Sequence, residues 1–397
     1  MSTSRVPGQR TPEHRPPFVA ASERRQSPEP PPLAPDRRLG VALIGLGRLS
    51  LEAILPAIGV SKLVRLAAVM TGDKAKGARV AEEYGAPADA VFGYDEWDAL
   101  GQREDVAFVY IVTPNGMHCA QVLAAARVGK PVLCEKPMAN SSAEARRMID
   151  ACEKAGVPLM IAYRAQYEPH NREVVRLARS GALGALKMIE AHNGQVQDTA
   201  DQWRHVRRLA GGGALPDVGL YCLNFARFVT GEEPVRVLGW AWSTPGDPRF
   251  AEVEENVAWQ MAFPSGVVAR LSTAYDAHES RSARLHFQKA TVILDPAFAY
   301  RGLRLRIRHR STEREDVEVD EEIIIAEQDQ FATELDHMAE CLLTGRAPLT
   351  PGEEGLQDHL IMEAIYESSR EDRPVALPGS GRLDAFRGPS LDAGQVK

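Results

Sequence analysis

The 397-residue sequence predicts an α/β protein in two parts, a doubly wound parallel sheet followed by an α/β domain with an open, mostly antiparallel sheet. Two observations carry this prediction. As far as residue 162, apolar runs alternate with amphipathic stretches, as strands and crossover helices do in a parallel sheet. Between Val235 and Arg308, apolar and polar residues alternate along short segments, which is typical of antiparallel strands with one covered face.

The first strand is expected at Leu39–Ile44, and the turn after it contains the sequence Gly45-Leu46-Gly47-Arg48-Leu49-Ser50. A strand, a glycine turn and a helix in this order form the context that a dinucleotide-binding fingerprint requires. Gly45 would allow the tight turn, and Gly47 would let the backbone approach a pyrophosphate at the helix N-terminus. The third position of the fingerprint is Ser50, not Gly or Ala, which is a small departure because Ser is still compact.

The end of the second expected strand, Val64–Met70, indicates which dinucleotide is bound. NAD-binding chains usually carry Asp or Glu there to hold the ribose 2′-hydroxyl, but this chain has Thr71. Three cations follow, Lys74, Lys76 and Arg79. This pattern favours a 2′-phosphate, and so NADP over NAD. Two alternatives stay open: the cations only cover the exposed face of a helix at 74–84, or Asp73 keeps some affinity for NAD.

The rest of the first part follows the same alternation of strand and helix. Strands are expected at 106–112, 132–135 and 158–162, and helices at 117–128 and 141–155. Residues 37–162 are therefore expected to form a dinucleotide-binding domain.

The strand at 132–135 ends in Glu135-Lys136-Pro137. Proline limits the continuation of a strand and biases the residue before it away from helix, so Lys136 is expected to leave the sheet at its carboxyl edge. Ligands bind at this edge in open α/β sheets, which would place the Lys136 charge in a cleft. The alternative is a solvated loop lysine.

Residues 163–378 are expected to form the second domain, for substrate binding and oligomerisation. Its helices are expected at 169–180, from Pro216, at 328–343 and at 352–369, and its strands at 185–191, 235–242, 256–263, 266–274, 284–288, 291–294 and 303–308. The helix from Pro216 follows a bend of three glycines, Gly211-Gly212-Gly213, and carries Asp217 and Tyr221. These two residues are at i and i+4, so they share one face. The alternative for Tyr221 is a half-buried core tyrosine.

Composition argues against several classes of protein. The net charge of -7 gives no reason to expect a nucleic-acid or anionic-membrane partner. No apolar run reaches the roughly 18–20 residues that span a bilayer. The five cysteines include no CxxC pair, which fits a reducing compartment, and a cytoplasmic protein is expected. The ten histidines form no HxH or HxxxH pair, so no metal site is expected.

The two ends of the chain differ from the rest. Residues 1–36 are rich in Pro, Arg, Ser and Glu and poor in apolar residues, so they are expected to be disordered or to form an arm that orders against a neighbouring subunit. No secretory leader is visible. Residues 379–397 are expected to form a loose tail.

The joint occurrence of these motifs resembles the Gfo/Idh/MocA oxidoreductases, and within that family the glucose–fructose oxidoreductase branch. The resemblance spans about Arg37 to Pro374. It rests on Gly45-Leu46-Gly47, Thr113-Pro114-Asn115 with His118, Glu135-Lys136-Pro137, Trp203-Arg204, and Gly211-Gly212-Gly213 followed by Asp217-x-Gly219-x-Tyr221. It implies a Rossmann domain followed by an α/β domain whose open sheet face often packs on another subunit, so a homo-oligomer, dimer or tetramer, is expected.

The resemblance also implies roles for particular residues. Lys136 would sit at the nicotinamide and the sugar C1 oxygen, Tyr221 would be the catalytic tyrosine, and Asp217 stands one turn before it. The residues expected to bind NADP are Gly45, Gly47, Arg48, Leu49, Thr71, Gly72, Lys76, Thr113, Pro114, Asn115, His118, Glu135, Lys136, Arg164, Trp203 and Arg204. Gln166 and Tyr167 lie where substrate-facing residues vary, so the identity of the sugar does not transfer.

The expected reaction is oxidation of an aldose at C1, with NADP as hydride acceptor and a lactone as product. The cofactor carries the hydride chemistry, and the protein positions the reactants and handles the hydroxyl proton. A nearby lysine ammonium favours the phenolate form of Tyr221. Three possibilities stay open: NADP retained and reoxidised by a second sugar, a simple aldose 1-dehydrogenase, or a catalytically silent NADP or sugar sensor on the same fold.

Overall fold

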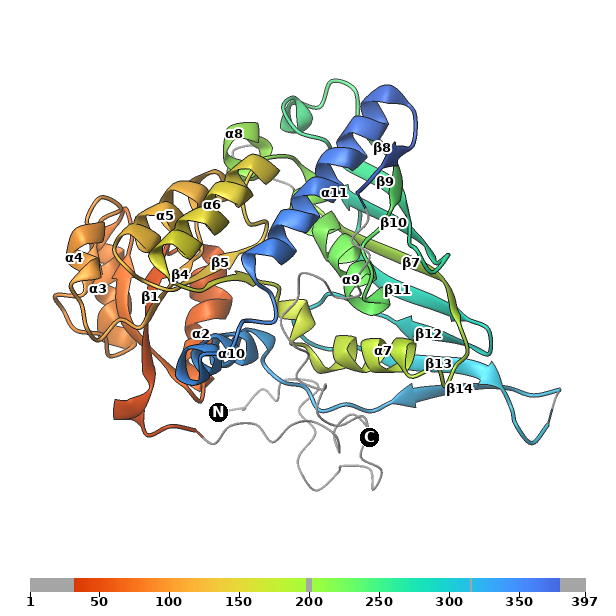
Figure 1. Cartoon of the computed structure of the whole chain (residues 1–397), viewed down its shortest axis with the longest axis horizontal. Helices are drawn as coiled ribbons and strands as arrows, with labels where there is room; N and C mark the ends of the chain where they lie inside the picture. The colour runs from red at the N-terminus through yellow and green to blue at the C-terminus, as the bar shows by residue number, and fades with distance from the viewer. Residues whose placement is uncertain (1–31, 198–201, 315, 379–397) are drawn as a thin grey trace, which may run out of the picture.

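Two sheets of different topology organise the chain (Figure 1). The computed structural model describes residues 32–197, 202–314 and 316–378. The arm expected at 1–36 is therefore described only from residue 32, and the tail expected at 379–397 lies outside the described residues. The two predicted sheets are both present.

The first sheet has six parallel strands in the order β3-β2-β1-β4-β5-β6. Their bounds are Leu39–Ile44 (β1), Val64–Met70 (β2), Val91–Phe92 (β3), Phe108–Ile111 (β4), Val132–Glu135 (β5) and Leu159–Ala162 (β6). Only β3 was not predicted, because two residues are too few to show a periodicity. The strand order reverses between β1 and β4, and ligands bind at such a switch point in doubly wound sheets.

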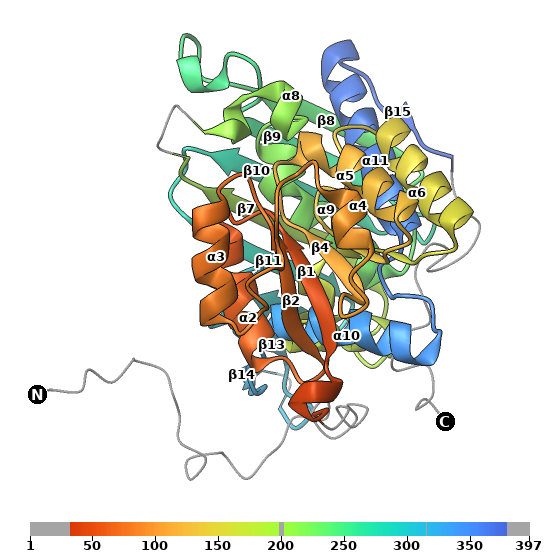
Figure 2. The same cartoon turned by 90° about the vertical axis from the view of Figure 1, so that its left-hand side faces the viewer.

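Helices lie on both sides of this sheet (Figure 2). They are α2 (Leu55–Val60), α3 (Lys74–Glu83), α4 (Trp97–Gly101), α5 (Asn115–Arg127) and α6 (Ser142–Ala155), and a π-helical turn at Ser50–Ile54 precedes α2. None of the helices in the described ranges combines the length and the apolar character needed to cross a membrane.

Helix α10 (Gln330–Thr344) comes from near the end of the chain but packs against the first sheet, beside α2 (Figure 1). Its Phe331 and Leu335 share one hydrophobic core with the side chains of β1. The Asp336 carboxylate accepts hydrogen bonds from the backbone N–H groups of Lys62 and Leu63 at 3.1 and 2.9 Å. We keep 37–162 and 163–378 as proposed domains, with α10 as a helix that the second contributes to the core of the first.

The second sheet has nine strands in the order β14-β13-β12-β11-β7-β10-β9-β8-β15. Their bounds are Leu186–Gln195 (β7), Arg236–Trp242 (β8), Asn256–Ala262 (β9), Val268–Tyr275 (β10), Ser280–Phe287 (β11), Ala290–Leu294 (β12), Leu305–Arg310 (β13), Glu318–Ile323 (β14) and Val375–Ala376 (β15). All neighbours are antiparallel except β7 and β10, which confirms the mostly antiparallel sheet.

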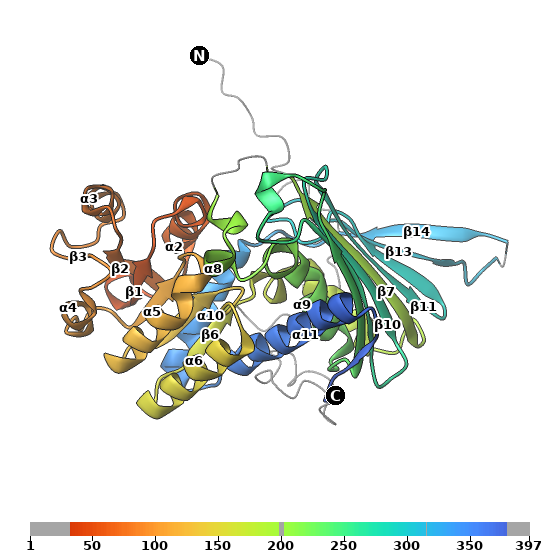
Figure 3. The same ribbon diagram turned by 90° about the horizontal axis from the view of Figure 1, so that it is seen from above.

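One face of the second sheet is covered, and the other is bare of any described helix (Figure 3). Helices α9 (Leu220–Thr230) and α11 (Gly352–Glu371) pack on the face toward the first sheet, and α7 (Pro169–Arg179) packs against α9. On the opposite face, Trp240 and Trp242 of β8 are 67% and 42% exposed, with ring centroids 5.2 Å apart.

A buried cluster of charges ties α9 to α11. The Arg227 guanidinium donates to the carboxylates of Glu233 at 2.7 Å, Glu354 at 2.9 Å and Asp358. None of these side chains is more than 2% exposed. The cluster fixes the position of α9, the helix that begins with Leu220 and Tyr221.

Candidate active site

The glycine turn after β1 borders open space. Gly45 has a φ of +97°, and a Cβ there would lie 2.7 Å from the Val112 carbonyl oxygen, so this position requires glycine. A Cβ on Gly47 would meet nothing within 4 Å. The Ser50 hydroxyl donates to the Gly45 carbonyl oxygen at 2.7 Å and is fully buried, so the third position of the fingerprint closes the turn with a hydrogen bond.

The end of β2 lies beside this turn. Lys76 Nζ donates to the Leu46 carbonyl oxygen at 3.3 Å, which places its ammonium over the glycine turn. Thr71 is buried, and its hydroxyl oxygen accepts from the Asp73 N–H at 3.2 Å. The Asp73 carboxylate caps α3 by accepting from the Lys76 N–H at 2.9 Å, and this hydrogen bond lowers the pKa of Asp73. The Asp73 carboxylate is thus engaged at the helix N-terminus, while the Lys76 ammonium is directed at the glycine turn.

Two residues after β4, Asn115 and His118, bond to the segments that follow β4 and β5 and to the glycine bend. His118 is buried, and its two ring nitrogens lie 2.8 Å from the Thr113 carbonyl oxygen and 3.0 Å from that of Pro137. Burial lowers the pKa of His118. Asn115 Nδ2 donates to the Ala210 carbonyl oxygen at 2.8 Å. These side chains hold the ends of β4 and β5 and the glycine bend in place, and both nitrogens of His118 are engaged by the protein.

Strand β5 ends at Glu135 and delivers Lys136 to the carboxyl edge of the sheet. The Glu135 carboxylate accepts from the Tyr110 hydroxyl at 2.7 Å and from the Lys136 N–H at 3.2 Å. Burial raises the pKa of Glu135, while the Lys136 charge acts against that shift. The Lys136 side chain is 13% exposed, so it is not a solvated loop lysine.

The Lys136 ammonium contacts Asp217, which belongs to the second domain. Lys136 Nζ donates to the Asp217 carbonyl oxygen at 2.8 Å and lies 3.4 Å from its carboxylate Oδ1. The other carboxylate oxygen accepts from Arg204 Nε at 2.9 Å and from the Tyr275 hydroxyl at 2.7 Å. Burial alone would raise the pKa of Asp217, but Arg204 and Lys136 hold it well below its usual range. Asp217 is therefore a fixed anion that orients two cations.

Tyr221, in the first turn of α9, lies against two cations. Lys136 Nζ is 4.7 Å from the centroid of its ring, and Arg164 Cζ is 4.6 Å away. Arg164 Nε donates to the Tyr221 hydroxyl oxygen at 3.1 Å. Burial acts to lower the pKa of Lys136, but its interactions with Tyr221, Asp217 and Glu135 raise the pKa above its usual value. The ammonium is therefore charged at neutral pH. A phenol beside two cations can lose and regain a proton, and the ammonium can bind an oxygen of a ligand.

Two protein-family models match this chain. An oxidoreductase family with an NAD-binding Rossmann fold, GFO_IDH_MocA, matches residues 39–163, and the GFO/IDH/MocA C-terminal domain matches residues 171–293. The chain belongs to the Gfo/Idh/MocA oxidoreductase family. The resemblance that the motifs indicate is thus confirmed at the level of the family, while the narrower resemblance to the glucose–fructose oxidoreductase branch stays a prediction.

Three Gfo/Idh/MocA relatives cover most of the chain. D-xylose 1-dehydrogenase [NADP(+)] from Haloarcula marismortui is 33% identical over 87% of this chain and 94% of that protein. D-xylose 1-dehydrogenase (NADP(+)) 2 from Haloferax volcanii is 30% identical over 84% of this chain and 98% of that protein. The crystal structure of aldose-aldose oxidoreductase from Caulobacter crescentus, complexed with glycerol, has 41% identity and a TM-score of 0.82, over 86% of this chain and 100% of that one.

The structure sorts the expected site residues of this Gfo/Idh/MocA chain into groups. Lys136, Asp217 and Tyr221 meet at one point, and Arg164 and Arg204, which were expected at the cofactor, contact that group directly. Trp203 lies beside it, with its ring centroid 4.6 Å from Arg204 Cζ. The glycine turn and Lys76 form a second group at the ends of β1 and β2.

Four expected cofactor residues have weaker structural support. The Arg48 side chain is 87% exposed and pairs with Glu52 at 2.8 Å. Leu49 is partly buried against the core that β1 shares with α10. A Cβ on Gly72 would contact only the Tyr94 ring, at 3.6 Å, and Pro114 is the N-cap residue of α5.

Sequence reasoning missed two tyrosines in this site. Tyr275, the last residue of β10, supplies the hydroxyl that bonds Asp217. Tyr300 packs on Arg164, whose Cζ lies 4.4 Å from the centroid of the Tyr300 ring. A single tyrosine at the end of a strand or in a loop has neither periodicity nor a spacing to a partner, so no signal in the sequence could have found them.

The glycines of the bend before Asp217 are explained by close packing. A Cβ on Gly211 would lie 2.8 Å from Asn140 Oδ1, and one on Gly213 would overlap the backbone carbonyl of Glu254. The bend therefore lets the segment that carries Asp217 approach both the first domain and the second sheet.

Proposed function

We propose that this chain is an NADP-dependent sugar oxidoreductase that oxidises an aldose at C1 to a lactone. The observation that carries the proposal is the meeting of Lys136, Asp217 and Tyr221 at the carboxyl edge of the sheet that bears the glycine turn. The relatives named as NADP-dependent xylose dehydrogenases and as an aldose-aldose oxidoreductase support both the cofactor and the class of substrate. The cytoplasmic location also remains a proposal, supported by five buried cysteines without disulfides.

The residues present fit the cofactor. The open space at Gly47 leaves room for a pyrophosphate at a helix N-terminus, and the Lys76 ammonium stands beside the same turn, where a ribose 2′-phosphate would be bound. Bound NADP would accept the hydride from C1 of the sugar.

The side chains would handle the proton and hold the substrate. Lys136, already oriented by Asp217, would donate a hydrogen bond to the C1 oxygen. Tyr221, as phenolate, would take the proton of the C1 hydroxyl while the C1–H bond breaks, and the C1–O bond becomes a carbonyl. Asp217 keeps its partners throughout, so it positions the other two.

The test is a screen of aldoses, including D-xylose and D-glucose, with added NADP. The absorbance of the reduced nicotinamide measures the reaction. We expect reduction with at least one aldose, and a rate lower by a factor on the order of 10²–10⁴ in the Lys136→Met variant. A protein that binds NADP but reduces it with none of these sugars would instead support the silent sensor.

We expect wild-type protein to bind NADP about tenfold or more tightly than NAD, since a charge-assisted hydrogen bond contributes roughly 1.5–3 kcal/mol. Lys76→Ala should lose most of that preference by weakening NADP alone. Lys74→Ala is the matched control on the same helix, because its ammonium pairs with Glu96 at 2.6 Å. Calorimetric titration of both cofactors measures the ratio, and equal affinities in the wild type would contradict the assignment.

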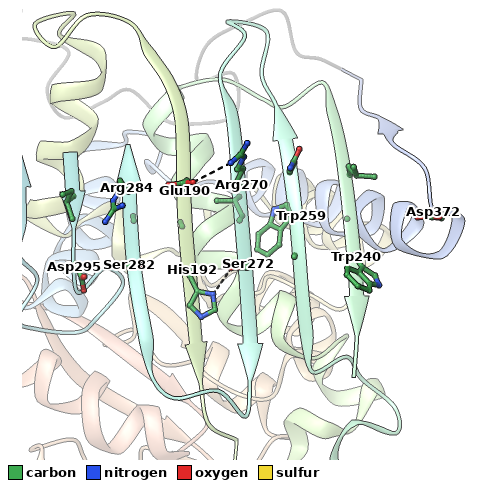
Figure 4. Close-up of a pocket in the computed structure, with 18 residues that line it drawn as sticks. Glu190, His192, Trp240, Trp259, Arg270, Ser272, Ser282, Arg284, Asp295 and Asp372 are labelled. Atoms are coloured by element: carbon green, nitrogen blue, oxygen red, sulfur yellow. Dashed lines mark hydrogen bonds and ion pairs between the residues drawn. The ribbon is translucent and has the colours of Figure 1, made fainter. Parts of the chain in front are cut away.

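We propose that the chain forms a homo-oligomer through the bare face of the second sheet. Leu238, Trp240 and Trp242 are exposed on β8, and an exposed apolar patch commonly marks a protein interface. Figure 4 shows this face, with Glu190 and Arg270 on neighbouring strands and Trp240 further along. Light scattering at micromolar concentration should give a dimer or tetramer, and Trp240→Asp should shift it toward monomer. A wild-type monomer is the contrary result.

We further propose that NADP stays bound between turnovers, so that one sugar reduces it and a second sugar reoxidises it. The support is the 41% identity to a protein whose name pairs two aldoses. Purified, dialysed protein should release near-stoichiometric NADP(H) on denaturation, and two sugars should give parallel double-reciprocal lines. Nucleotide-free protein that depends on added NADP would identify a simple dehydrogenase.

A further inference from the structure

Arg164 has an unusual environment for a buried cation. It begins the 3-10 turn after β6 and is 4% exposed. Its Nε donates to the Tyr221 hydroxyl oxygen at 3.1 Å. One terminal nitrogen donates to the Phe298 carbonyl oxygen at 2.8 Å, and the other donates to Gln330 Oε1 and the Ala299 carbonyl oxygen.

Each of these partners is neutral when Tyr221 is protonated. Within the described ranges, no carboxylate lies within ion-pair distance of the Arg164 guanidinium. Buried arginines are usually paired with an acid, because an uncompensated buried charge is costly. The Glu135 carboxylate acts on Arg164 only from beyond ion-pair distance. Ionisation of Tyr221 would supply an anion in direct contact, where a charged hydrogen bond forms.

The other groups that face Tyr221 are already engaged. Lys136 bonds to Asp217 and faces the ring of Tyr221, while Asp217 is held by Arg204 and Tyr275. The remaining titratable neighbours are Tyr300, stacked on Arg164, Glu135 with Tyr110, which bond to each other, and Glu334 of α10. Glu334 is fully buried, and burial together with Glu135 raises its pKa well above the usual range, which favours its neutral form. Arg164 is thus the cation bonded directly to the Tyr221 oxygen.

We propose that Arg164 is a positioning residue that stabilises the phenolate of Tyr221, the proton acceptor of the proposed reaction, through the hydrogen bond to its oxygen. This inference rests on the proposed function only for the reaction, not for the ionisation itself. It departs from the cofactor-binding role that the resemblance implies, since the guanidinium is buried and its nitrogens are directed at Tyr221 and the loop at 298–299.

The ionisation can be measured without any sugar. The tyrosinate absorbance of the NADP-bound wild type, minus that of Tyr221→Phe, isolates one phenol among the nine tyrosines. In Arg164→Met, we expect this difference transition to move up by about 1 pH unit or more, because a contacting opposite charge contributes about 1–3 units. Arg164→Lys, which keeps a charge and serves if the Met variant fails to fold, should shift less. An unmoved transition in both would overturn the inference, whatever the substrate proves to be.

Kinetics gives the second readout. With an aldose that the wild type oxidises, the acid limb of the kcat/KM profile should move to higher pH in the Arg164 variants. Their activity should be partly recovered at alkaline pH, and their NADP affinity should stay within a few-fold of wild type. In a Tyr221→Phe background, Arg164→Lys should cause no further loss. Arg127→Met is the control, because that guanidinium pairs with Asp98 and both side chains are exposed. Equal loss at every pH, or a loss of NADP affinity with an unchanged profile, would contradict the role.

Discussion

Lys136→Met is expected to lower sugar oxidation by a factor on the order of 10²–10⁴, since it removes a group that holds the reacting oxygen and assists proton transfer. Binding of NADP should stay within a few-fold of wild type, because the glycine turn and Lys76 lie at the ends of β1 and β2 and do not contact this side chain in any described bond. Asp217 would lose one partner but keep Arg204 and Tyr275.

The measurement pairs the oxidation rate with the nucleotide affinity of the same preparation. Lys187→Met is the matched control, since it makes the same change at an exposed position on β7. Oxidation within a few-fold of wild type in the Lys136 variant would remove this residue from the mechanism.

Arg227→Met is expected to reduce the free energy of unfolding by about 3–5 kcal/mol, the usual cost of removing one partner from a buried ion pair. The side chains of Glu233, Glu354 and Asp358 would lose their only guanidinium among the described contacts while staying buried. Burial already raises the pKa of Asp358 to about 6 in the presence of the cation.

The size of this loss should depend on pH. Without Arg227, the buried carboxyls bind protons more readily in the folded state than in the unfolded state, so the stability of the variant rises as pH falls. Denaturant unfolding at pH 5 and pH 8 should show a smaller deficit at pH 5. Arg127→Met is the control, because the exposed pair of Arg127 with Asp98 contributes only about 0–1 kcal/mol. Similar midpoints for both variants would show that the cluster is not essential for stability.

Periodicity in the sequence was sufficient to predict both sheets. Strands β1 and β2 have the predicted bounds, because a central parallel strand is a continuous apolar run with clear ends. Strand β14 was missed because Glu318–Ile323 is mostly charged, and its pairing depends on cross-strand bonds such as Arg308 to Asp320. An edge strand of this kind has no apolar face to reveal it.

The candidate site could be predicted only where its residues belong to local motifs. The Glu135-Lys136-Pro137 strand end and the pair of Asp217 and Tyr221 are visible as spacings, and the structure brings them together. The bonds from Tyr275 to Asp217 and from Arg164 to Tyr221 join segments more than 50 residues apart. Such contacts are set by how the two sheets face each other, which no local pattern encodes.

The docking of α10 on the first sheet has a consequence for how the chain is made. Ribosomes release β1 to β6 first, but the helix that completes their core begins only at Gln330. Until then, the apolar surface that Phe331 and Leu335 cover is open to water or to a chaperone. The nascent dinucleotide-binding segment therefore cannot reach its final stability during translation, and a chain that stops short of Gln330 is expected to aggregate instead of yielding a working half.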